Sequence, residues 1–526
     1  IYIDPPYNTG NDFIYPDDYA ETLQTYLEYT GQVDSDGRKF TTNTEADGRF
    51  HSKWLNMLYP RLYLARNLLR EDGVIFVSID DNEIDSLRKI CNEVFGEENF
   101  TACIANVNNP KGRSDDKYFA RAHEYLVVYR KGEASLRGWE PDERILKRYN
   151  KISADGRPYR EIDLRKTGDN DRREDRPNLF YYFLYNPETG ELTPTRDEST
   201  REGFISIRPL REDGSEGNWR WEIKASLERA LVLVAKLMPV RKIWSVFEMD
   251  YLQPDERIKP TTAWTMKEVN SERGTEQFIA LGFDKELFPR PKPVGLLGQI
   301  LALAAAPHQT DIVMDFFAGS GTTGQAVLDL NHQDGGNRRF ILVQLPEATG
   351  REDYPTIADI CKERVRRVIK KLNDEDASKL ALDGDKKQDR GFRVFKLAES
   401  NFKTWNADLP QGDVAALEEQ LAMHVDHLIA DRTAEDRLYE LLLKSGFPLT
   451  THVETLTLDG KTVYSVQGGA MLICLNKELS FEAIKAMAEM KPERVVCLDE
   501  GFAGNDQLKT NAVQTMKGKN IVFRTV

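Results

Sequence analysis

The first residues of the chain carry side chains suited to one kind of chemistry. A short apolar stretch, typical of the end of a buried strand, runs into Asp4-Pro5-Pro6-Tyr7. Because proline cannot extend a strand ladder and fixes its own backbone, this exit presents a carboxylate, two carbonyls without strand partners and an aromatic ring. The carboxylate and a proline carbonyl can accept both hydrogens of a planar amino group while Tyr7 stacks on its ring. Taken alone, such a motif is better explained as a turn after a core strand. A catalytic interpretation requires that the chain also contains a cofactor site that could use such an amine.

A glycine-rich segment far downstream supplies that second site. An apolar stretch beginning at residue 312 leads through Asp315 into a turn and then a predicted helix, 325–330. The turn contains Gly319, Gly321 and Gly324. Their Gly-x-Gly-x-x-Gly spacing is weak evidence for a nucleotide-type ligand by itself, but the strand–turn–helix context strengthens it. Glycines there let the backbone approach a ligand and place helix N-terminal amides beside it.

A second predicted strand, 340–345, ends shortly before Glu347. An acid at that position can bind a ribose hydroxyl. A solvated loop acid explains Glu347 equally well.

Together these motifs resemble those of S-adenosylmethionine-dependent DNA amino-methyltransferases. Asp4 to Tyr7 is similar to their catalytic motif and residues 315–324 to their cofactor loop, in the order found in the circularly permuted β group. Further segments are similar to the modification (Mod) subunit of type III restriction-modification systems: 51–61, 73–83, 401–405 and 499–502. The chain has no initiator Met and begins inside a predicted strand, so we interpret it as a fragment lacking its natural N-terminal segment.

The resemblance implies methyl transfer from S-adenosyl-L-methionine to the N6 of an adenine flipped out of double-stranded DNA, with no metal. It assigns the catalytic role to Asp4, Pro5, Pro6 and Tyr7. It assigns cofactor binding to Lys292, Pro293, Asp315, Phe316, Ala318, Gly319, Gly321, Thr322, Thr323 and Glu347. Methylation of cytosine N4 is chemically similar, although in this family Asp at the first motif position favours adenine. A non-catalytic DNA-recognition or assembly subunit that keeps the fold is the alternative from another class.

The expected fold class is α/β. It comprises a circularly permuted Rossmann-like methyltransferase sheet, an inserted target-recognition domain and a C-terminal α+β domain. The predicted domains are the catalytic half, the insertion, the cofactor-binding half and an assembly domain, at 1–132, 133–287, 288–390 and 391–526. The last has no visible catalytic cluster, so we expect it to support a Mod homodimer or docking of a restriction subunit with helicase and nuclease activity.

Hydrophobic periodicity predicts the main elements. Helices are expected at 54–69, 82–95, 224–237, 294–305, 357–372, 418–429 and 434–445. Strands are expected at 74–79, 100–107, 124–129, 180–184, 204–207, 472–475, 494–498 and 521–523, with a hairpin of 451–458 and 462–467 closed by Asp459-Gly460. Residues 8–50 read as a long loop with interspersed aromatic residues, and 373–390 as a charged linker.

Composition bounds the functional classes. With 526 residues the chain is too long for one core, and 40% hydrophobic and 30% charged residues describe a soluble globular protein without a membrane span. The five cysteines have no paired metal-binding spacing, which fits a reducing cytoplasm. A net charge of −14 is awkward for a DNA-binding protein. Three basic residues are candidates for phosphate contacts, with a solvated loop as the alternative: Lys111, Arg113 and Lys117.

Overall fold

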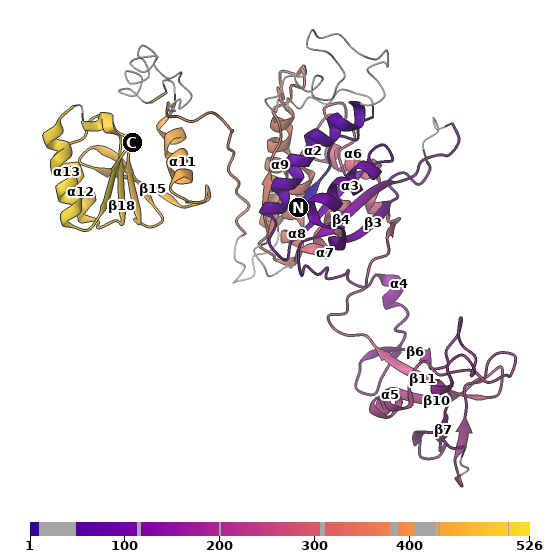
Figure 1. Ribbon diagram of the computed structural model, residues 1–526. Helices are drawn as coiled ribbons and strands as arrows, with labels where there is room; N and C mark the ends of the chain where they lie inside the picture. The colour runs from indigo at the N-terminus through magenta and orange to yellow at the C-terminus, as the bar shows by residue number, and fades with distance from the viewer. Residues whose placement is uncertain are drawn as a thin grey trace, which may run out of the picture. The chain divides into compact units, whose positions relative to one another are not determined.

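The computed structural model describes residues 1–9, 49–112, 117–198, 201–305, 311–378, 388–403, 428–429, 432–502 and 504–526. The chain divides into two units, Ile1–Gly391 and Phe392–Val526 (Figure 1). Arg113, nearly all of the predicted loop 8–50 and most of the predicted helix 418–429 lie outside the described residues.

A mixed five-stranded sheet forms the first half of the first unit. Its strands follow the order β1-β2-β4-β3-β12. They are β1 (Tyr2–Ile3), β2 (Val74–Ile79), β3 (Phe100–Asn106), β4 (Glu124–Arg130) and β12 (Ala263–Trp264). Because β1 and β2 are parallel and β4 is antiparallel to both β2 and β3, the ends of β1, β2 and β3 share one edge with the start of β4. Any polar side chains placed at these four points therefore lie close together.

A parallel pair, β13 (Ile312–Asp315) and β14 (Arg339–Leu342), forms the second half, and β13 contacts β1. Helices cover the strands on two faces. Tyr2 packs in a core with α7 (Val294–Ala304) and α8 (Thr322–Asp334), whereas Ile3 packs in a core with α2 (Arg49–Leu68) and α3 (Ile84–Phe95). This alternation of adjacent strand residues brings two distant parts of the sequence into one layered structure.

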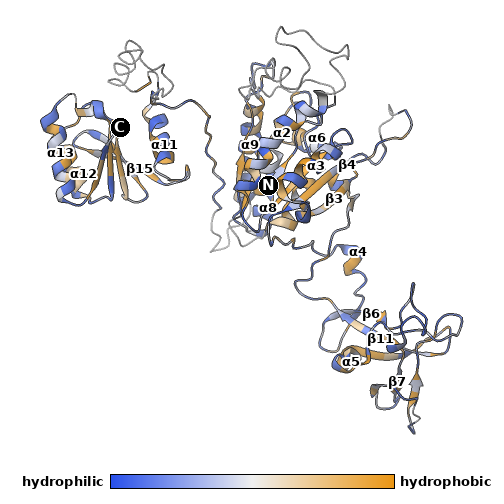
Figure 2. Cartoon of the chain, viewed as in Figure 1, coloured by the Kyte–Doolittle hydropathy of each residue, from blue (hydrophilic) through white to orange (hydrophobic). Residues whose placement is uncertain are grey.

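Many predicted elements of this unit are confirmed. The helix predicted at 54–69 is α2, and its stripe residues are all buried: Trp54, Leu58, Leu62, Ala65 and Leu69. The strand predicted at 74–79 has those bounds and is buried throughout. Figure 2 colours β3 and β4 of the same sheet mainly as hydrophobic. Within the described ranges, no helix combines the length and apolarity needed to span a bilayer.

Two expectations are wrong. The helix predicted at 224–237 is a short helix, α5 (Ile223–Glu228), followed by strand β10 (Leu233–Leu237). The strand forms because Leu233 and Ala235 alternate into the core while β10 pairs with β11 (Trp244–Tyr251). The predicted linker 373–390 instead begins within helix α9 (Ile357–Ser378), which continues past residue 372.

Between β4 and β12 the chain forms a lobe with its own hydrophobic core. Its strands make two sheets, β10-β11-β6-β5 and β8-β7-β9. The remaining strands are β5 (Lys151–Ile152), β6 (Pro158–Asp163), β7 (Tyr182–Tyr185), β8 (Leu192–Thr195) and β9 (Ile205–Ile207), with a short helix α4 (Glu143–Leu146) at the start. Trp219 lies fully buried in this core. The segment after the lobe contains α6 (Ser271–Ala280) and leads into α7.

The second unit is a sheet of order β15-β16-β17-β18-β19, antiparallel at first and then parallel. Its strands are β15 (Val453–Leu458), β16 (Lys461–Val466), β17 (Met471–Cys474), β18 (Arg494–Cys497) and β19 (Val522–Thr525). Helix α11 (Ala434–Lys444) packs in one core, and α12 (Phe481–Glu489) and α13 (Asp506–Gly518) in another. The predicted hairpin is confirmed, since Asp459 and Gly460 both have positive φ at its turn.

Candidate active site

The Asp-Pro-Pro-Tyr motif leaves β1 at the edge where β2 and β3 also end. Its backbone is braced by the fully buried Trp54, whose indole N–H donates to the Pro6 carbonyl at 2.7 Å. The carbonyl of Pro6 is therefore already engaged by a side chain of the protein. Next to the motif, Asn8 is buried and donates to Glu83 at 2.5 Å.

Four elements bring a buried polar cluster together beside Asp4. The Lys292 ammonium lies 2.7 Å from Glu124 Oε2, 3.3 Å from Asp4 Oδ1 and 2.6 Å from the Tyr7 hydroxyl. The Tyr7 hydroxyl donates to Glu124 Oε2 at 3.0 Å, and Asn106 donates to Glu124 Oε1 at 3.0 Å. We name Asp4, Tyr7, Asn106, Glu124 and Lys292 the catalytic-edge cluster.

Electrostatics in the cluster are dominated by burial and by three close charges. Burial raises the pKa of Asp4, the Lys292 charge lowers it, and the Glu124 charge raises it, leaving a net increase. Burial lowers the pKa of Lys292, but Asp4 and Glu124 outweigh it, so that the pKa lies above its usual value and the ammonium stays charged. Burial, together with the charges of Asp4 and Glu124, raises the pKa of Tyr7 well above its usual value, which keeps the phenol neutral.

Asp4 differs from Glu124 in access and in bonding. The Asp4 side chain retains 28% of its exposure, compared with 7% for Glu124 and 16% for Lys292. Within the described part of the chain, Asp4 Oδ1 accepts no hydrogen bond. Oδ1 is itself buried, and a buried acceptor without a hydrogen-bond donor is unusual in a folded protein. The exposed part of Asp4 therefore belongs to the rest of its side chain.

The glycine-rich segment starts where β13 ends and is ordered by Asp315. One carboxylate oxygen of Asp315 accepts from the Phe317 amide at 3.0 Å and the other from the Thr323 hydroxyl at 2.5 Å. Burial raises the pKa of Asp315 to about 7, although these two hydrogen bonds lower it. The Gly319 amide donates to Gln344 Oε1 at 2.7 Å, which ties the turn to the chain after β14.

Gly319 and Gly321 both have positive φ, but their surroundings differ. A Cβ on Gly321 would lie 3.0 Å from Cys361 Sγ and 3.1 Å from the Cys361 carbonyl of α9. A Cβ on Gly319 would be 3.3 Å from the Phe288 ring and would have no close backbone neighbour. Close packing against α9 thus requires a glycine at position 321. Position 319 has more space around its Cα atom.

Arg364, on helix α9, stabilises the same turn through hydrogen bonds. Its guanidinium is fully buried and donates to Ser320 at 2.8 Å, Thr322 at 2.7 Å and Gln325 at 2.9 Å. Burial lowers the pKa of Arg364 to about 10, so the residue remains cationic at neutral pH. The residue holds the start of α8 in place.

The structure places the predicted site residues in two neighbouring groups. Asp4, Tyr7 and Lys292 meet in the catalytic-edge cluster, whereas residues 315–323 run from the last residue of β13, the strand that contacts β1, into α8. The side chain of Phe316 is half-buried, whereas Ala318 and Thr323 are buried, and Pro293 is the N-cap of α7. Glu347 is exposed, and Gln344, three positions earlier, contacts the turn instead.

Sequence reasoning missed five residues that shape this region: Trp54, Asn106, Glu124, Gln344 and Arg364. Glu124 offered one signal, since it is an acid at the first position of a strand that is otherwise apolar. The others became visible only when the elements were assembled.

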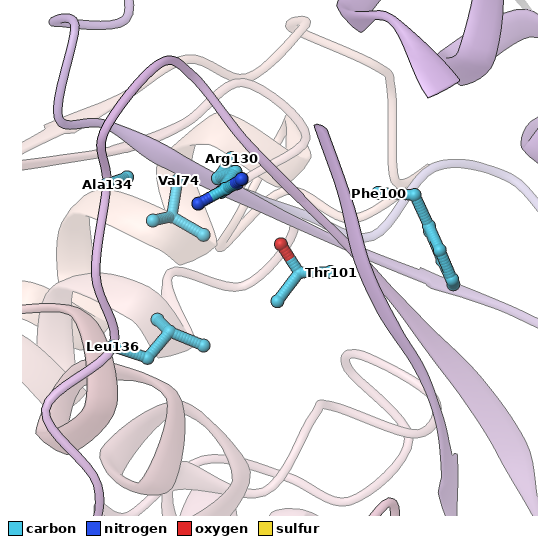
Figure 3. Close-up of a pocket in the computed structure, with 6 residues that line it drawn as sticks. All are labelled: Val74, Phe100, Thr101, Arg130, Ala134 and Leu136. Atoms are coloured by element: carbon cyan, nitrogen blue, oxygen red, sulfur yellow. The ribbon is translucent and has the colours of Figure 1, made fainter. Parts of the chain in front are cut away.

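A pocket of about 330 Å³ lies elsewhere, between Val74, Phe100, Thr101, Arg130, Ala134 and Leu136 (Figure 3). Val74 starts β2, Phe100 starts β3 and Arg130 ends β4, so this pocket is at the opposite end of the strands from Asp4. It does not belong to the catalytic edge.

Comparisons with known proteins give a consistent assignment. A family model described as a DNA methylase, N6_N4_Mtase, matches residues 1–363. The type III restriction-modification enzyme EcoPI Mod subunit of Escherichia phage P1 is 32% identical over 525 residues, covering 96% of this chain and 76% of that protein. The EcoP15I Mod subunit of Escherichia coli is 29% identical over 560 residues, covering 97% and 78%. The solved M1.HpyAVI–SAM complex is 14% identical with a TM-score of 0.25, covering 59% of this chain and 82% of that one. By its sequence, the chain belongs to the N6/N4 DNA methylase family and to the type III Mod subunits within it, which makes it a DNA methyltransferase of a restriction-modification system.

Proposed function

We propose that the chain transfers a methyl group from S-adenosyl-L-methionine to the N6 of an adenine in double-stranded DNA. The observation that carries this proposal is the Asp4 carboxylate at the exit of β1, whose side chain remains partly exposed and whose buried Oδ1 has no hydrogen-bond donor among the described residues. Pro5 and Tyr7 belong to the same motif. When bound, S-adenosylmethionine supplies an electrophilic methyl group on a positively charged sulfur.

The residues after β13 fit such a cofactor. Helix α8 has Gly321 as its N-cap, so no side chain caps its first amides and they can receive a carboxylate. Gly319 leaves room for close approach of a ligand to the backbone, and Gln344 offers a polar group beside it. We propose Lys292, Pro293, Asp315, Phe316, Ala318, Gly319, Gly321, Thr322, Thr323 and Glu347 as the cofactor-binding set, with Gln344 added.

The catalytic edge is built to activate an aromatic amine. Such an amine is a weak nucleophile because its lone pair is delocalised into the ring. Hydrogen bonds from both N–H groups to Asp4 and to the Pro5 carbonyl localise that lone pair and stabilise the positive charge that develops on nitrogen. Tyr7 provides the stacking surface, and its hydroxyl contacts with Glu124 and Lys292 fix the orientation of the ring.

The segment joining β3 to β4 suits contact with DNA. It leaves the catalytic edge at Asn106 and returns at Glu124, so its two ends belong to the cluster. Tyr118 and Phe119 are 80% and 87% exposed there. Exposed aromatic rings beside a site that needs an unstacked base can fill the space that the base leaves. Lys111 and Lys117 are also exposed and are candidates for phosphate contacts.

The wider assembly is proposed from the resemblance and the fold. We propose a circularly permuted methyltransferase sheet with a target-recognition lobe inserted between β4 and β12, a homodimer, association with a restriction subunit and a cytoplasmic location. The catalytic strands precede the cofactor strands in the chain, and β1 contacts β13, which supports the permuted order. Several arginines of the lobe pair with carboxylates, including Arg160 with Asp250 and Arg220 with Glu248.

Methyl transfer to DNA in vitro tests the function. The protein is incubated with labelled S-adenosylmethionine and mixed-sequence duplex DNA, and the DNA is then digested to nucleosides for mass spectrometry. We expect N6-methyladenine in samples with wild-type protein and none with Asp4→Asn. N4-methylcytosine instead would identify the alternative base. No methylated nucleoside, despite cofactor binding measured by calorimetry, would favour a non-catalytic recognition subunit.

A further inference from the structure

We propose that Glu124 and Lys292 form a positioning pair that leaves Asp4 as the less compensated of the two carboxylates, and that Asp4 therefore accepts the proton released from the methylated amine. This inference rests on the proposed function. It assigns a role to two residues that do not need to touch the substrate.

The hydrogen-bond geometry separates the two carboxylates. Glu124 receives donors on both oxygens, from Asn106 on one and from Tyr7 and Lys292 on the other. Its Lys292 contact is 2.7 Å, whereas the Asp4 contact with the same ammonium is 3.3 Å and leaves Oδ1 without a hydrogen bond among the described residues. The hydrogen-bond capacity of Glu124 is thus used within the cluster, whereas Asp4 has fewer donors and the more exposed side chain.

The charge balance of the cluster gives the same assignment. Two carboxylates surround one ammonium, so the cluster carries one excess negative charge, and Asp4 is the more exposed of the two acids. An excess negative charge favours the positive charge that appears on the amine during the reaction. Once the amine has lost its proton to Asp4, the cluster is neutral, which suits its buried surroundings.

The proposed step conserves atoms and electrons. The amine nitrogen uses its lone pair to form the bond to the methyl carbon, and the sulfur–methyl bond breaks with its electron pair remaining on sulfur. One N–H bond of the resulting cation then breaks, its electron pair returns to nitrogen, and the proton moves to the Asp4 carboxylate. No oxidant, reductant or metal is required.

Several charged and titratable groups lie near Asp4 and can change its pKa, so a test of the inference has to take each of them into account. They are Lys292 on the segment before α7, Glu124 on β4, Tyr2 in β1 and Tyr7 after it, and Asp315 on β13. Lys292 lowers the pKa of Asp4 and Glu124 raises it. Removing each charge in turn should therefore move the pKa of Asp4 in opposite directions.

Single-turnover methylation as a function of pH tests the inference. Because Asp4 must be ionised to accept a proton, activity rises with pH through its pKa. Glu124→Gln should move this rise to lower pH, and Lys292→Met should move it to higher pH, each by about one unit, as expected for charges within a few ångströms. Lys292→Arg keeps the charge and should return the rise toward its wild-type position. Glu440→Gln is the matched control because it alters a carboxylate–lysine pair of equal length, 2.7 Å, in the second unit, and it should not move the rise.

A second readout needs no cofactor and no turnover. Infrared titration follows the protonated carboxyl band that is missing in Asp4→Asn, and it should show the same opposite shifts in Glu124→Gln and Lys292→Met. If Lys292→Met does not fold, the inference is tested with Glu124→Gln alone, by the pH profile of methylation and by the infrared titration. Shifts in the same direction, or unmoved profiles with Asp4→Asn inactive, would overturn the inference alone. An active Asp4→Asn would overturn the proposed function as well.

Discussion

Asp315 makes the stability of the first unit depend on pH. Its pKa is raised from 3.8 to about 7, chiefly by burial. The folded state therefore binds the proton more tightly than the unfolded state, so the stabilisation is complete below about pH 4 and is lost as pH rises toward 7. A shift of this size corresponds to at most about 4 kcal/mol. Urea unfolding of wild type and Asp315→Asn between pH 4 and 8 should show the wild-type advantage shrinking with rising pH. Parallel pH dependences would contradict this account.

At the residue scale, the sequence predicts what is local. Asp4, Tyr7, Asp315 and the glycines lie inside short motifs whose chemistry can be read from adjacent positions. Glu124 could not be assigned, because its role depends on Lys292 and Tyr7, which arrive from distant segments.

At the element scale, Gly319 and Gly321 in the turn after β13 are subject to different structural constraints. The sequence predicts that both bring backbone to the cofactor, whereas the structure packs Gly321 against Cys361. Gly321→Ala should cost on the order of 2 kcal/mol in stability, since the Cβ clashes and φ is +84°.

Gly319→Ala is the matched variant for ligand proximity. Its Cβ would be close to the Phe288 ring at 3.3 Å and in ordinary contact with the Phe317 carbonyl at 3.9 Å, and its φ is +51°, so the loss of stability should be about 1 kcal/mol. Calorimetric titration should show that the free energy of S-adenosylmethionine binding weakens by more than the free energy of unfolding does. Unchanged affinity would remove Gly319 from the cofactor site.

Element prediction succeeded where one periodicity was clear. Residues 74–79 are apolar apart from Ser78 and form a strand buried on both faces, and the stripe of α2 matches its buried residues. Residues 224–237 contain a helix-like pattern, but pairing of β10 with β11 overrides it. A local pattern cannot reveal that partner strand.

At the scale of the whole molecule, the contact between β1 and β13 is the feature that sequence patterns cannot supply. Asp4 and Asp315 lie at the ends of these two strands, although the lobe and several helices separate them in the chain. Only the resemblance to a known family predicted their proximity.

The boundary between the two units determines how a truncation should be made. Arg390 is buried and pairs with Asp376 at 2.6 Å and with Asn373 at 2.9 Å, so the first unit needs residues up to 391. Deleting residues 392–526 should retain S-adenosylmethionine binding, because both halves of the site remain. It should lower the oligomeric mass in light scattering or abolish co-purification with a restriction subunit. Unchanged mass with intact association would refute an assembly role for the second unit.

The central claim is that Asp4 activates the target amine, and single-turnover methylation by Asp4→Asn tests it most directly. The amide keeps the size of the side chain but replaces one acceptor oxygen with a donor and removes the charge. With S-adenosylmethionine affinity checked by calorimetry, we expect Asp4→Asn to bind the cofactor nearly as wild type does and to lose methyl transfer by at least about a thousandfold, comparable to loss of a major transition-state interaction. Methylation of adenine by Asp4→Asn at a rate close to wild type would contradict the account.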